Sequence, residues 1–317
     1  MRVVFWGSPE FAVPILEGLV DSRHEVAGVV SQPDRPKGRG RAVEPTPVAR
    51  RAGAAGLTVL TPAKPRGEAF LDELRRLGAD IFVVAAYGEI LPALVLEMPP
   101  HGALNVHASL LPAYRGAAPV TQALLDGLET TGITIMRMEA GLDTGPICLQ
   151  AEEPIRPDDT AGLLAGRLAV SGARLAVEAL DRLESGTLTE TPQDNARASH
   201  AGKVDPRDAR IDWELPSATL ERAVRAYDPW PGAWTTWRGE RLKVFRLALI
   251  RRPAGPSAEP GTLLDVDAEP VLQTGDGAVR LVLVQPAGGL RMSGPEWARG
   301  REPRRGERLG GHGDGAG

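Results

Sequence analysis

Short apolar runs alternate with longer amphipathic stretches over the first 185 residues of the chain. The runs are rich in β-branched side chains, are bounded by turn-forming residues, and include 2–6, 25–31, 57–60, 80–87 and 131–138. The stretches between them repeat apolar residues at the spacing of a helix. Strands that alternate with helices in this way are typical of βαβ units on a parallel sheet. The pattern therefore predicts an α/β domain with a doubly wound, mostly parallel sheet.

The run at 81–86 has no polar side chain at all, which is typical of a central strand buried on both faces. Helices are predicted at 11–22, 47–56, 69–78 and 160–184. In sheets of this kind ligands bind beyond the carboxyl ends of the strands, where the loops carry the chemistry. We therefore search those loops for functional residues.

The pattern changes after residue 185. Residues 186–206 have poor periodicity and many turn formers, so they are predicted to be a linker. One helix (217–227) and several short strands (241–250, 261–266 and 270–286) follow, the last strand pair turning at 274–277. Short strands with Gly-rich turns favour a small β-barrel. The predicted domains are thus 1–185 and 207–309, with a disordered tail at 310–317.

Composition places the chain among soluble globular proteins, with 42% hydrophobic and 25% charged residues. The longest apolar runs are far shorter than the roughly 20 residues of a membrane span. The first residues lead directly into a strand pattern without a signal peptide, so we expect a cytoplasmic protein that does not contact a membrane. The formal net charge is −4, but residues 201–317 carry 18 basic and 16 acidic side chains against 19 and 25 in residues 1–200. The later part is the more basic one, a weak indication of a polyanionic partner.

Cysteine and histidine are scarce. Cys148 is the single cysteine, which excludes an internal disulfide and argues against a thiolate metal cluster. None of the five histidines stands four residues from another, so no zinc motif is present. We expect no metal in the protein.

The segment GSPEFAVPIL joins the first predicted strand to the first helix, where a dinucleotide-binding loop would lie. It lacks the G-x-G-x-x-G pattern, which argues against a nucleotide-dependent oxidoreductase. Ser8 as the N-cap with Pro9 at the first helical position explains the segment structurally.

The loop at 32–48 carries four basic side chains, Arg35, Lys37, Arg39 and Arg41, with no acid between Asp34 and Glu44. Composition alone allows two interpretations. The loop is either a solvated surface segment or a cationic arm that binds phosphates, as arginine-rich segments do when they order on RNA.

The segment NVHASLLPAYRG begins as a strand, with Asn105, His107 and Ser109 on one alternation. An amide can donate to a developing oxyanion, and an imidazole can move a proton near neutral pH. Asp143, in the loop GLDTG, could orient that imidazole and favour its charged form. Polar residues at strand ends also satisfy backbone groups, and the sequence by itself does not bring the three residues together.

Eight motifs resemble those of the methionyl-tRNA formyltransferases, within the wider family of enzymes that use 10-formyltetrahydrofolate. In order they are GSPEFA, QPDRPKGRGR, VVAAYGEILP, NVHASLLPAYRGAAPV, TGITIMRMEAGLDTG, ARIDWELPS, RAYDPWPGAW and QPAGG. The similarity extends over nearly the whole chain, except for the last residues, GGHGDGAG. It implies a Rossmann-like domain followed by a barrel that resembles an OB fold.

The resemblance also implies functional residues. The family's catalytic residues correspond to Asn105, His107 and Asp143. Its folate-contacting segment corresponds to Ser109, Leu110, Leu111 and Pro112, and AYGEILP to a segment whose backbone helps hold the pterin. A loop arginine that helps recognise the initiator tRNA corresponds to Arg39. The implied substrates are 10-formyltetrahydrofolate and initiator methionyl-tRNA, used by a monomer without a metal.

Two rival functions remain at this point. One is a formyltransferase or hydrolase of the same family that acts on a small-molecule amine, although such an acceptor needs neither the basic loop nor the second domain. The other is a tRNA-binding protein without catalytic activity. The presence of Asn105, His107 and Asp143 together argues against the second.

Overall fold

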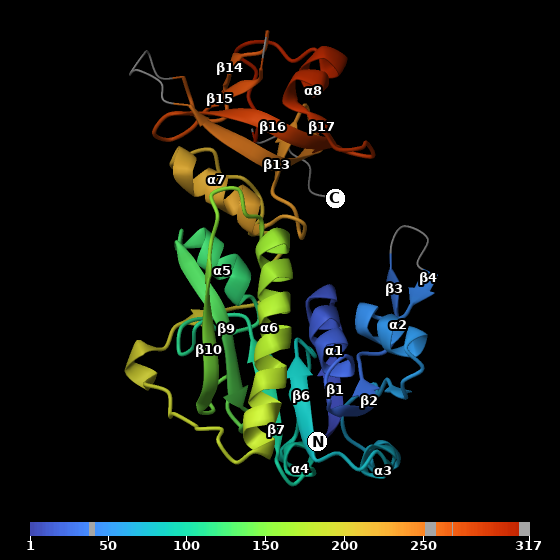
Figure 1. The fold of residues 1–317 in the computed structure, drawn as a ribbon. Helices are drawn as coiled ribbons and strands as arrows, with labels where there is room; N and C mark the ends of the chain where they lie inside the picture. Colours follow the sequence, from blue (N-terminus) through green and yellow to red (C-terminus); the bar gives the residue numbers. More distant parts are fainter. Residues whose placement is uncertain (38–41, 251–257, 268, 311–317) are drawn as a thin grey trace. The chain divides into compact units, whose positions relative to one another are not determined.

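The computed structural model describes residues 1–37, 42–250, 258–267 and 269–310 (Figure 1). The chain divides into two compact units. One comprises residues 1–120, 129–155 and 164–203, and the other residues 121–128, 156–163 and 204–317. Two short segments between 121 and 163 therefore pack with the later part of the chain, which the hydrophobic pattern did not predict.

The first unit is built on a seven-stranded sheet with the order β10-β9-β7-β6-β1-β2-β5. Five strands run parallel, while β9 and β10 form an antiparallel hairpin at one edge. The strands are β1 (Arg2–Gly7), β2 (Glu25–Val30), β5 (Val59–Leu60), β6 (Ile81–Ala85), β7 (Ala103–His107), β9 (Thr130–Arg137) and β10 (Ile147–Pro154). Two small ribbons lie outside the sheet, β3 (Arg35–Lys37) with β4 (Ala42–Glu44) and β8 (Arg115–Gly116) with β11 (His200–Ala201). The predicted mostly parallel α/β sheet is confirmed.

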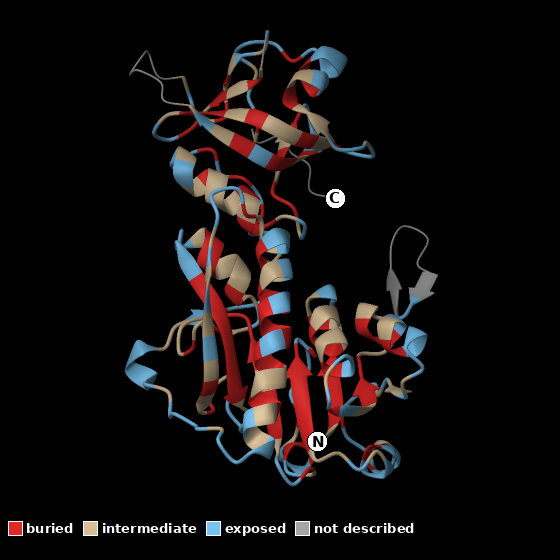
Figure 2. Cartoon of the chain, viewed as in Figure 1, coloured by how far each residue is buried: buried red, intermediate tan, exposed pale blue. Residues whose placement is uncertain are grey.

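Helices cover both faces of this sheet. They are α1 (Val13–Val20), α2 (Pro47–Ala54), α3 (Glu68–Arg76), α4 (Ala93–Leu96), α5 (Pro119–Leu125), α6 (Ala161–Glu184) and the short 3₁₀ turns η1 (Glu10–Ala12) and η2 (Asn195–Arg197). α1 and α6 lie side by side over the strands (Figure 1), and α6 approaches β7 so closely that a Cβ on Gly172 would lie 2.9 Å from Val106. On the other face α3 and α4 contribute Leu74 and Val95 to a core built around Trp6. The central strands are buried on both faces (Figure 2), as the apolar run at 81–86 predicted.

The second unit is an antiparallel β domain. Its strands are β12 (Trp234–Trp237), β13 (Glu240–Ile250), β14 (Leu263–Asp265), β15 (Val271–Gln273), β16 (Ala278–Pro286) and β17 (Met292–Ser293), with helices α7 (Ser217–Ala226) and α8 (Gly294–Arg301). The sheet order is β12-β13-β16-β15-β14, and β17 pairs with β16. Trp237 and Trp297 meet edge to face in its core, with ring centroids 5.1 Å apart. The predicted small β domain of OB-like class is confirmed, including the hairpin between β15 and β16.

Two further expectations concern single segments. The stretch 186–206 contains η2 and β11, and β11 pairs in parallel with β8, so part of this stretch is held by ladder hydrogen bonds. Of the predicted tail, Gly310 donates its N–H to the Thr236 carbonyl over 2.8 Å, and residues 311–317 lie outside the described residues. Among the described residues no helix is both long and apolar enough to pass through a membrane.

Candidate active site

Strand β7 holds Asn105 and His107 on the same side of the sheet. They are two residues apart, and β7 lies between β6 and β9 near the middle of the sheet. Both side chains reach the same carboxylate, Asp143, which lies in the loop between β9 and β10. The structure therefore brings together the three residues that the sequence could only suggest.

Asp143 receives donors from two directions. Asn105 Nδ2 donates to Oδ1 over 3.4 Å, and the backbone N–H of Gly116 donates to Oδ2 over 2.8 Å. His107 Nδ1 lies 3.7 Å from Oδ2. The side chains of His107 and Asp143 are 6% and 12% exposed, so their interaction is weakly screened by water. Asp143 itself has φ 53°, a left-handed conformation that is sparsely populated by residues other than glycine.

The other ring nitrogen of His107 has a partner of its own. Nε2 lies 2.9 Å from the Tyr114 carbonyl oxygen. A carbonyl can only accept, so Nε2 carries a proton and donates to it. At 3.7 Å the contact between Nδ1 and Asp143 is longer than a hydrogen bond. A proton on Nδ1 would thus remain available to a third group at this point.

The segment Ser109–Pro112 forms a turn directly after β7. Ser109 is buried, and its hydroxyl donates to the Ala113 carbonyl over 2.6 Å, so it fixes the turn and does not project into a cavity. Thr134 Oγ1 donates to the Ser109 carbonyl and accepts from the Leu111 N–H. Gln150 Nε2 also donates to the Leu111 carbonyl. The strand alternation that grouped Ser109 with Asn105 and His107 ends at His107, where β7 ends.

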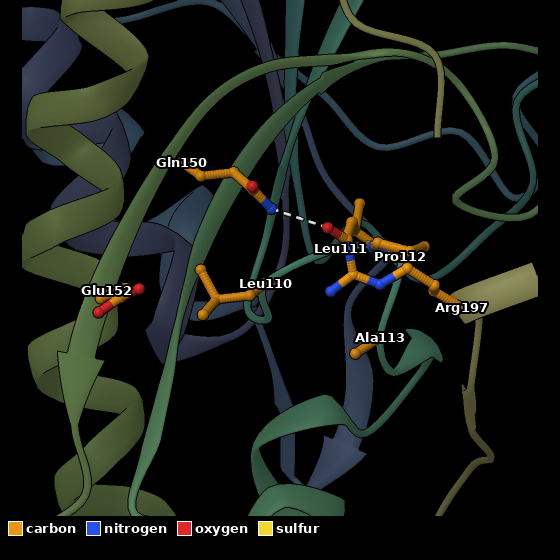
Figure 3. A pocket seen from close by; sticks show the side chains of 7 residues that line it. All are labelled: Leu110, Leu111, Pro112, Ala113, Gln150, Glu152 and Arg197. Atoms are coloured by element: carbon orange, nitrogen blue, oxygen red, sulfur yellow. Dashed lines mark hydrogen bonds between the residues drawn. The ribbon is translucent and has the colours of Figure 1, made fainter. Parts of the chain in front are cut away.

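A cavity of about 400 Å³ opens beside this turn (Figure 3). Its lining comprises Leu110, Leu111, Pro112, Ala113, Gln150, Glu152 and Arg197. Three of the four predicted folate-contacting residues line it, whereas none of Asn105, His107 and Asp143 does. The turn follows directly after β7, which carries Asn105 and His107, but the cavity beside it is lined by the turn and not by these side chains.

Two large apolar side chains are exposed, one in the loop AYGEILP, which resembles a segment that helps hold the pterin, and one in the loop that carries Asp143. Ile90, in AYGEILP, is 85% exposed, and Leu142, next to Asp143, is 63% exposed. Within AYGEILP, Ala86 and Gly88 have φ 48° and φ 91°, so the backbone turns sharply as it leaves β6. Exposed large apolar side chains are typical of ligand-binding surfaces.

Ser8 has a different role from the one that the sequence predicted. The N-cap of η1 is Pro9 and no side chain caps it, so the interpretation of Ser8 as an N-cap is wrong. Its hydroxyl donates to the Tyr87 carbonyl over 3.1 Å and accepts from the Gln32 N–H over 3.2 Å. Ser8 therefore ties the loop after β1 to those after β2 and β6, and tertiary bonds override the local capping preference. Arg39, in the loop after β2, lies outside the described residues.

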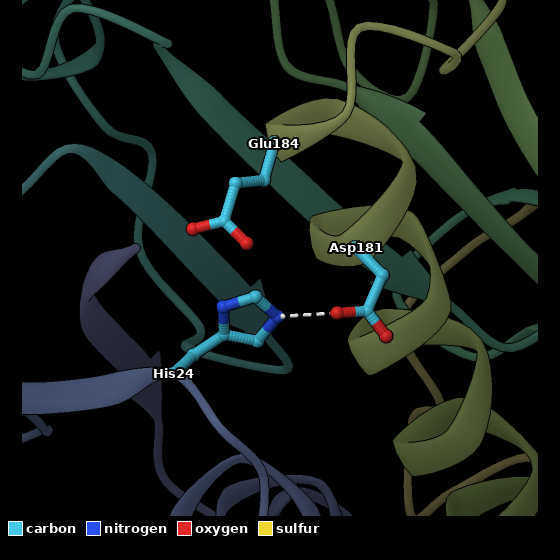
Figure 4. Close-up of side chains that lie close together, drawn as sticks. All are labelled: His24, Asp181 and Glu184. Carbon is cyan, nitrogen blue, oxygen red and sulfur yellow. Dashed lines mark ion pairs between the residues drawn. The ribbon is translucent and has the colours of Figure 1, made fainter.

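A second group of titratable residues lies at the far end of α6 (Figure 4). Ligand atoms of His24, Asp181 and Glu184 lie within 4.8 Å of one another. Arg23 already pairs with both carboxylates at 2.6 Å, and the Met1 amine lies 3.1 Å from Glu184. His24 Nε2 lies 3.3 Å from Asp181 Oδ1, but the geometry is not that of a hydrogen bond. Burial lowers the pKa of this imidazole. The group is a compensated ion cluster that holds α6 against the start of β2.

Two buried groups, the Cys148 thiol and the Tyr87 hydroxyl, stay protonated at neutral pH. Burial, aided by Glu190, raises the pKa of the Cys148 thiol to about 11, so this thiol stays protonated and poorly nucleophilic. Burial and then Glu89 raise the pKa of Tyr87 to about 12. Neither group is a candidate for a proton transfer at neutral pH.

Three residues that the sequence did not single out hold the Asn105–His107–Asp143 cluster in place. They are Tyr114 and Gly116, through backbone atoms, and Gln193, whose amide donates to the carbonyls of Asp143 and Gly145. Backbone contacts leave no signal in side-chain chemistry. Gln193 lies in the predicted linker, 50 residues from Asp143, where no local pattern marks it.

Comparisons with known proteins identify the family. Residues 1–180 match the family described as formyl transferase, and residues 203–302 match the formyl transferase C-terminal domain. The methionyl-tRNA formyltransferase of Roseiflexus castenholzii is 49% identical over 312 residues, which cover 98% of this chain and 99% of the relative. That of Streptomyces coelicolor is 46% identical over 311 residues, covering 98% and 100%.

Solved structures agree at the level of the fold. The N-formyltransferase from Helicobacter canadensis, determined with folinic acid and dTDP-3-aminofucose, has a TM-score of 0.67 at 20% identity and covers 89% of this chain and 98% of its own. HypX from Aquifex aeolicus with tetrahydrofolic acid has a TM-score of 0.65 at 18% identity, covering 94% of this chain and 47% of its own. With two family matches that together span most of the sequence, the chain belongs to the formyl transferase family.

Proposed function

We propose that this protein transfers the formyl group of 10-formyltetrahydrofolate to the α-amine of methionine on initiator tRNA, and so serves translation initiation. One observation carries the proposal: relatives named methionyl-tRNA formyltransferase are 46–49% identical over nearly the full length of both chains. The cluster of Asn105, His107 and Asp143 supports it, because its donors suit an acyl-transfer reaction. A family member that acts on a small-molecule amine is the less favoured alternative.

The folate co-substrate follows from the family and from relatives of similar fold that were solved with tetrahydrofolic acid or 5-N-formyl-THF. Leu110, Leu111 and Pro112 are proposed as its wall, with the exposed Ile90 and Leu142 as apolar contacts for its ring system. Ser109 acts by fixing the turn through its bond to Ala113.

In the reaction the neutral α-amine attacks the formyl carbon, and its nitrogen forms the new C–N bond. The formyl oxygen gains negative charge as the carbonyl opens. Asn105 Nδ2–H and a proton on His107 Nδ1 are proposed to donate to this oxygen, while the Tyr114 carbonyl orients the imidazole and Asp143 stabilises its positive charge. When the bond to N10 breaks, N10 receives the proton that the amine loses, and the carbonyl re-forms. Near neutral pH an α-amine is partly unprotonated, so the site has to position it more than to deprotonate it.

The tRNA contacts proposed here are Arg39 in the basic loop and the later part of the chain, residues 201–317, whose 18 basic and 16 acidic side chains leave it mildly basic and which would bind the phosphate backbone. We propose that the enzyme acts in the cytoplasm, where a reaction on aminoacylated tRNA would take place. We propose that the enzyme works as a monomer, which light scattering of the purified protein can test.

The decisive experiment supplies the purified protein with 10-formyltetrahydrofolate and methionine-charged initiator tRNA and measures formyl-methionine released from the tRNA. Charged elongator tRNA and free amino sugars are the comparison acceptors. We expect formylation of the initiator tRNA in preference to both. Transfer to a small amine with none to the tRNA would contradict the proposal.

A further inference from the structure

The carboxylate of Asp143 depends on a turn that is held from outside by one side chain. Gln193 Nε2 donates to the Asp143 carbonyl over 2.9 Å and to the Gly145 carbonyl over 2.7 Å. These bonds clamp both ends of the three-residue turn. The clamp is needed because Asp143 has a left-handed backbone, which a free loop would readily leave.

A buried cation fixes the direction of this amide. Gln193 Oε1 accepts from Arg115 Nε over 3.1 Å and from Nη2 over 2.8 Å. A guanidinium only donates and a carbonyl only accepts, so the oxygen of Gln193 must face Arg115 and its NH₂ group must face the turn. Arg115 is 5% exposed, and within the described ranges its side chain pairs with Gln193 and Asn195 and with no carboxylate. Its charge is thus used to orient the amide.

Arg115 also lies between the two backbone groups that hold the cluster. The carbonyl of the residue before it, Tyr114, accepts a hydrogen bond from His107 Nε2, and the N–H of the residue after it, Gly116, donates to Asp143 Oδ2. Residues 199–201 hold the same segment in place, since β8 pairs with β11 and the Tyr114 N–H donates to Ser199 Oγ. Hydrogen bonds through Arg115 and Gln193 therefore connect the turn of Asp143 to the backbone segment that holds His107.

We infer that Gln193, oriented by Arg115, is a positioning residue for formyl transfer: it sets the place of Asp143 relative to His107 without touching the reacting atoms. The inference rests on the catalytic role proposed above for Asp143. Displacement of a catalytic group by about 1 Å commonly lowers a rate about 100-fold. Because Gln193 contacts the backbone of the Asp143 turn and not the carboxylate, its loss is expected to lower kcat and to leave the KM of each substrate nearly unchanged.

Two variants separate positioning from stability. In Gln193→Ala every bond of the amide is lost. In Gln193→Glu one carboxylate oxygen keeps the pairing with Arg115, now as an ion pair, but no hydrogen remains to donate to Asp143 and Gly145. Asn195→Ala is the matched control, because Asn195 accepts from the same Arg115 Nη2 over 2.8 Å and has no bond to the Asp143 turn.

The measurements are kcat and KM for both substrates at 25 °C, with Tm of each protein. We expect kcat to fall about 10- to 100-fold in both Gln193 variants with each KM within about threefold, although Gln193→Glu, which keeps its pairing with Arg115, should lose less Tm than Gln193→Ala. Asn195→Ala should keep kcat within about twofold, because its effect is limited to one of the bonds of Arg115.

A wild-type kcat in Gln193→Glu would overturn the inference, as would a loss of Tm in Gln193→Ala with unchanged kcat. Asp143→Ala in the same assay keeps the two proposals apart. If Asp143→Ala is inactive while the Gln193 variants are fully active, positioning by Gln193 is wrong and the catalytic role stands. If Asp143→Ala retains wild-type kcat, the catalytic role itself is wrong.

Discussion

His107 Nδ1 lies 3.7 Å from Asp143 Oδ2, close enough for an ion pair and too far for a hydrogen bond. The imidazole is held instead through its other nitrogen, by the Tyr114 carbonyl. This arrangement gives Asp143 an electrostatic effect on the ring without a hydrogen bond to Nδ1. Under the proposed mechanism, a proton on Nδ1 of the imidazolium would be free to donate to the formyl oxygen.

Asp143→Asn tests this relationship, because it removes the negative charge and keeps the size of the side chain. The Asn oxygen can still accept from the Gly116 N–H, so the turn should hold. We expect kcat to fall at least about 100-fold, since the imidazolium loses its counter-charge. Single-turnover formylation at saturating folate measures the effect. A variant with more than half of the wild-type rate would rule out an electrostatic role.

Asn105 is expected to act as a donor. Asn105→Ala should lower kcat about 100- to 1,000-fold, the usual cost of losing one oxyanion donor. Asn105→Asp should be at least as severe, because it places an acceptor where a donor is needed and sets a second carboxylate against Asp143 Oδ1, now 3.4 Å from the amide. The comparison of kcat/KM between the two variants separates lost donation from added repulsion. If Asn105→Asp were the more active variant, the donor role would be wrong.

Much of the fold follows from patterns that are local in the sequence. The apolar run at 81–86 became the buried strand β6, and the helix predicted at 160–184 is α6. Alternation placed Asn105 and His107 on one side of β7, and both indeed reach Asp143. These predictions succeed because side-chain periodicity is set by the backbone itself.

The failures involve residues whose partners lie far along the chain. Ser8 fits an N-cap by local sequence but bonds to the loops of Gln32 and Tyr87. The stretch predicted as a linker supplies β11 and Gln193 to the site. These contacts join residues that are 24 to 85 positions apart, and they depend on the sheet order, which no local pattern contains.

Gly145 should tolerate no side chain, because a Cβ at this position would lie 1.9 Å from the Arg137 carbonyl oxygen. In Gly145→Ala the turn must shift, and with it Asp143 two residues before. We expect a lower Tm together with a large loss of kcat. Gly166→Ala in α6 is the control: a Cβ there meets nothing within 4 Å, and helical Ala is favoured over Gly by about 0.5–1 kcal/mol. Gly166→Ala should raise Tm and leave kcat unchanged, and wild-type kcat in Gly145→Ala would show that the turn adapts.

Arg39→Ala addresses the basic loop. If this arginine binds the tRNA, its loss should raise the KM for initiator tRNA at least about tenfold and change the folate KM little. The affinity for tRNA should also depend less steeply on salt concentration, by about one phosphate contact. Arg66→Ala, which removes an exposed charge elsewhere in the first unit, is the control. Equal effects of Arg39→Ala on both substrates would contradict a tRNA role for the loop.

The ion cluster at α6 predicts how stability depends on pH. His24 faces the Met1 amine, Asp181, Glu184 and the neighbouring Arg23. Burial, and then the positive charge of the amine, lower the pKa of His24 below its ordinary value near 6.5. Between the lowered pKa and 6.5 the unfolded chain binds more protons than the folded chain, so the free energy of unfolding falls as the pH drops through this interval. Arg23 and the amine lower the pKa values of Asp181 and Glu184, whose contribution is lost only in more acidic solution.

The free energy of unfolding in urea, measured from pH 7.5 to 5.0, tests this dependence. His24→Gln keeps a polar side chain that cannot gain a proton, so the decline below pH 6.5 should be smaller than in the wild type. His101→Gln, which replaces an exposed histidine, is the matched control and should retain the wild-type slope. Parallel curves for the wild type and His24→Gln would mean that His24 does not couple folding to protons in this interval.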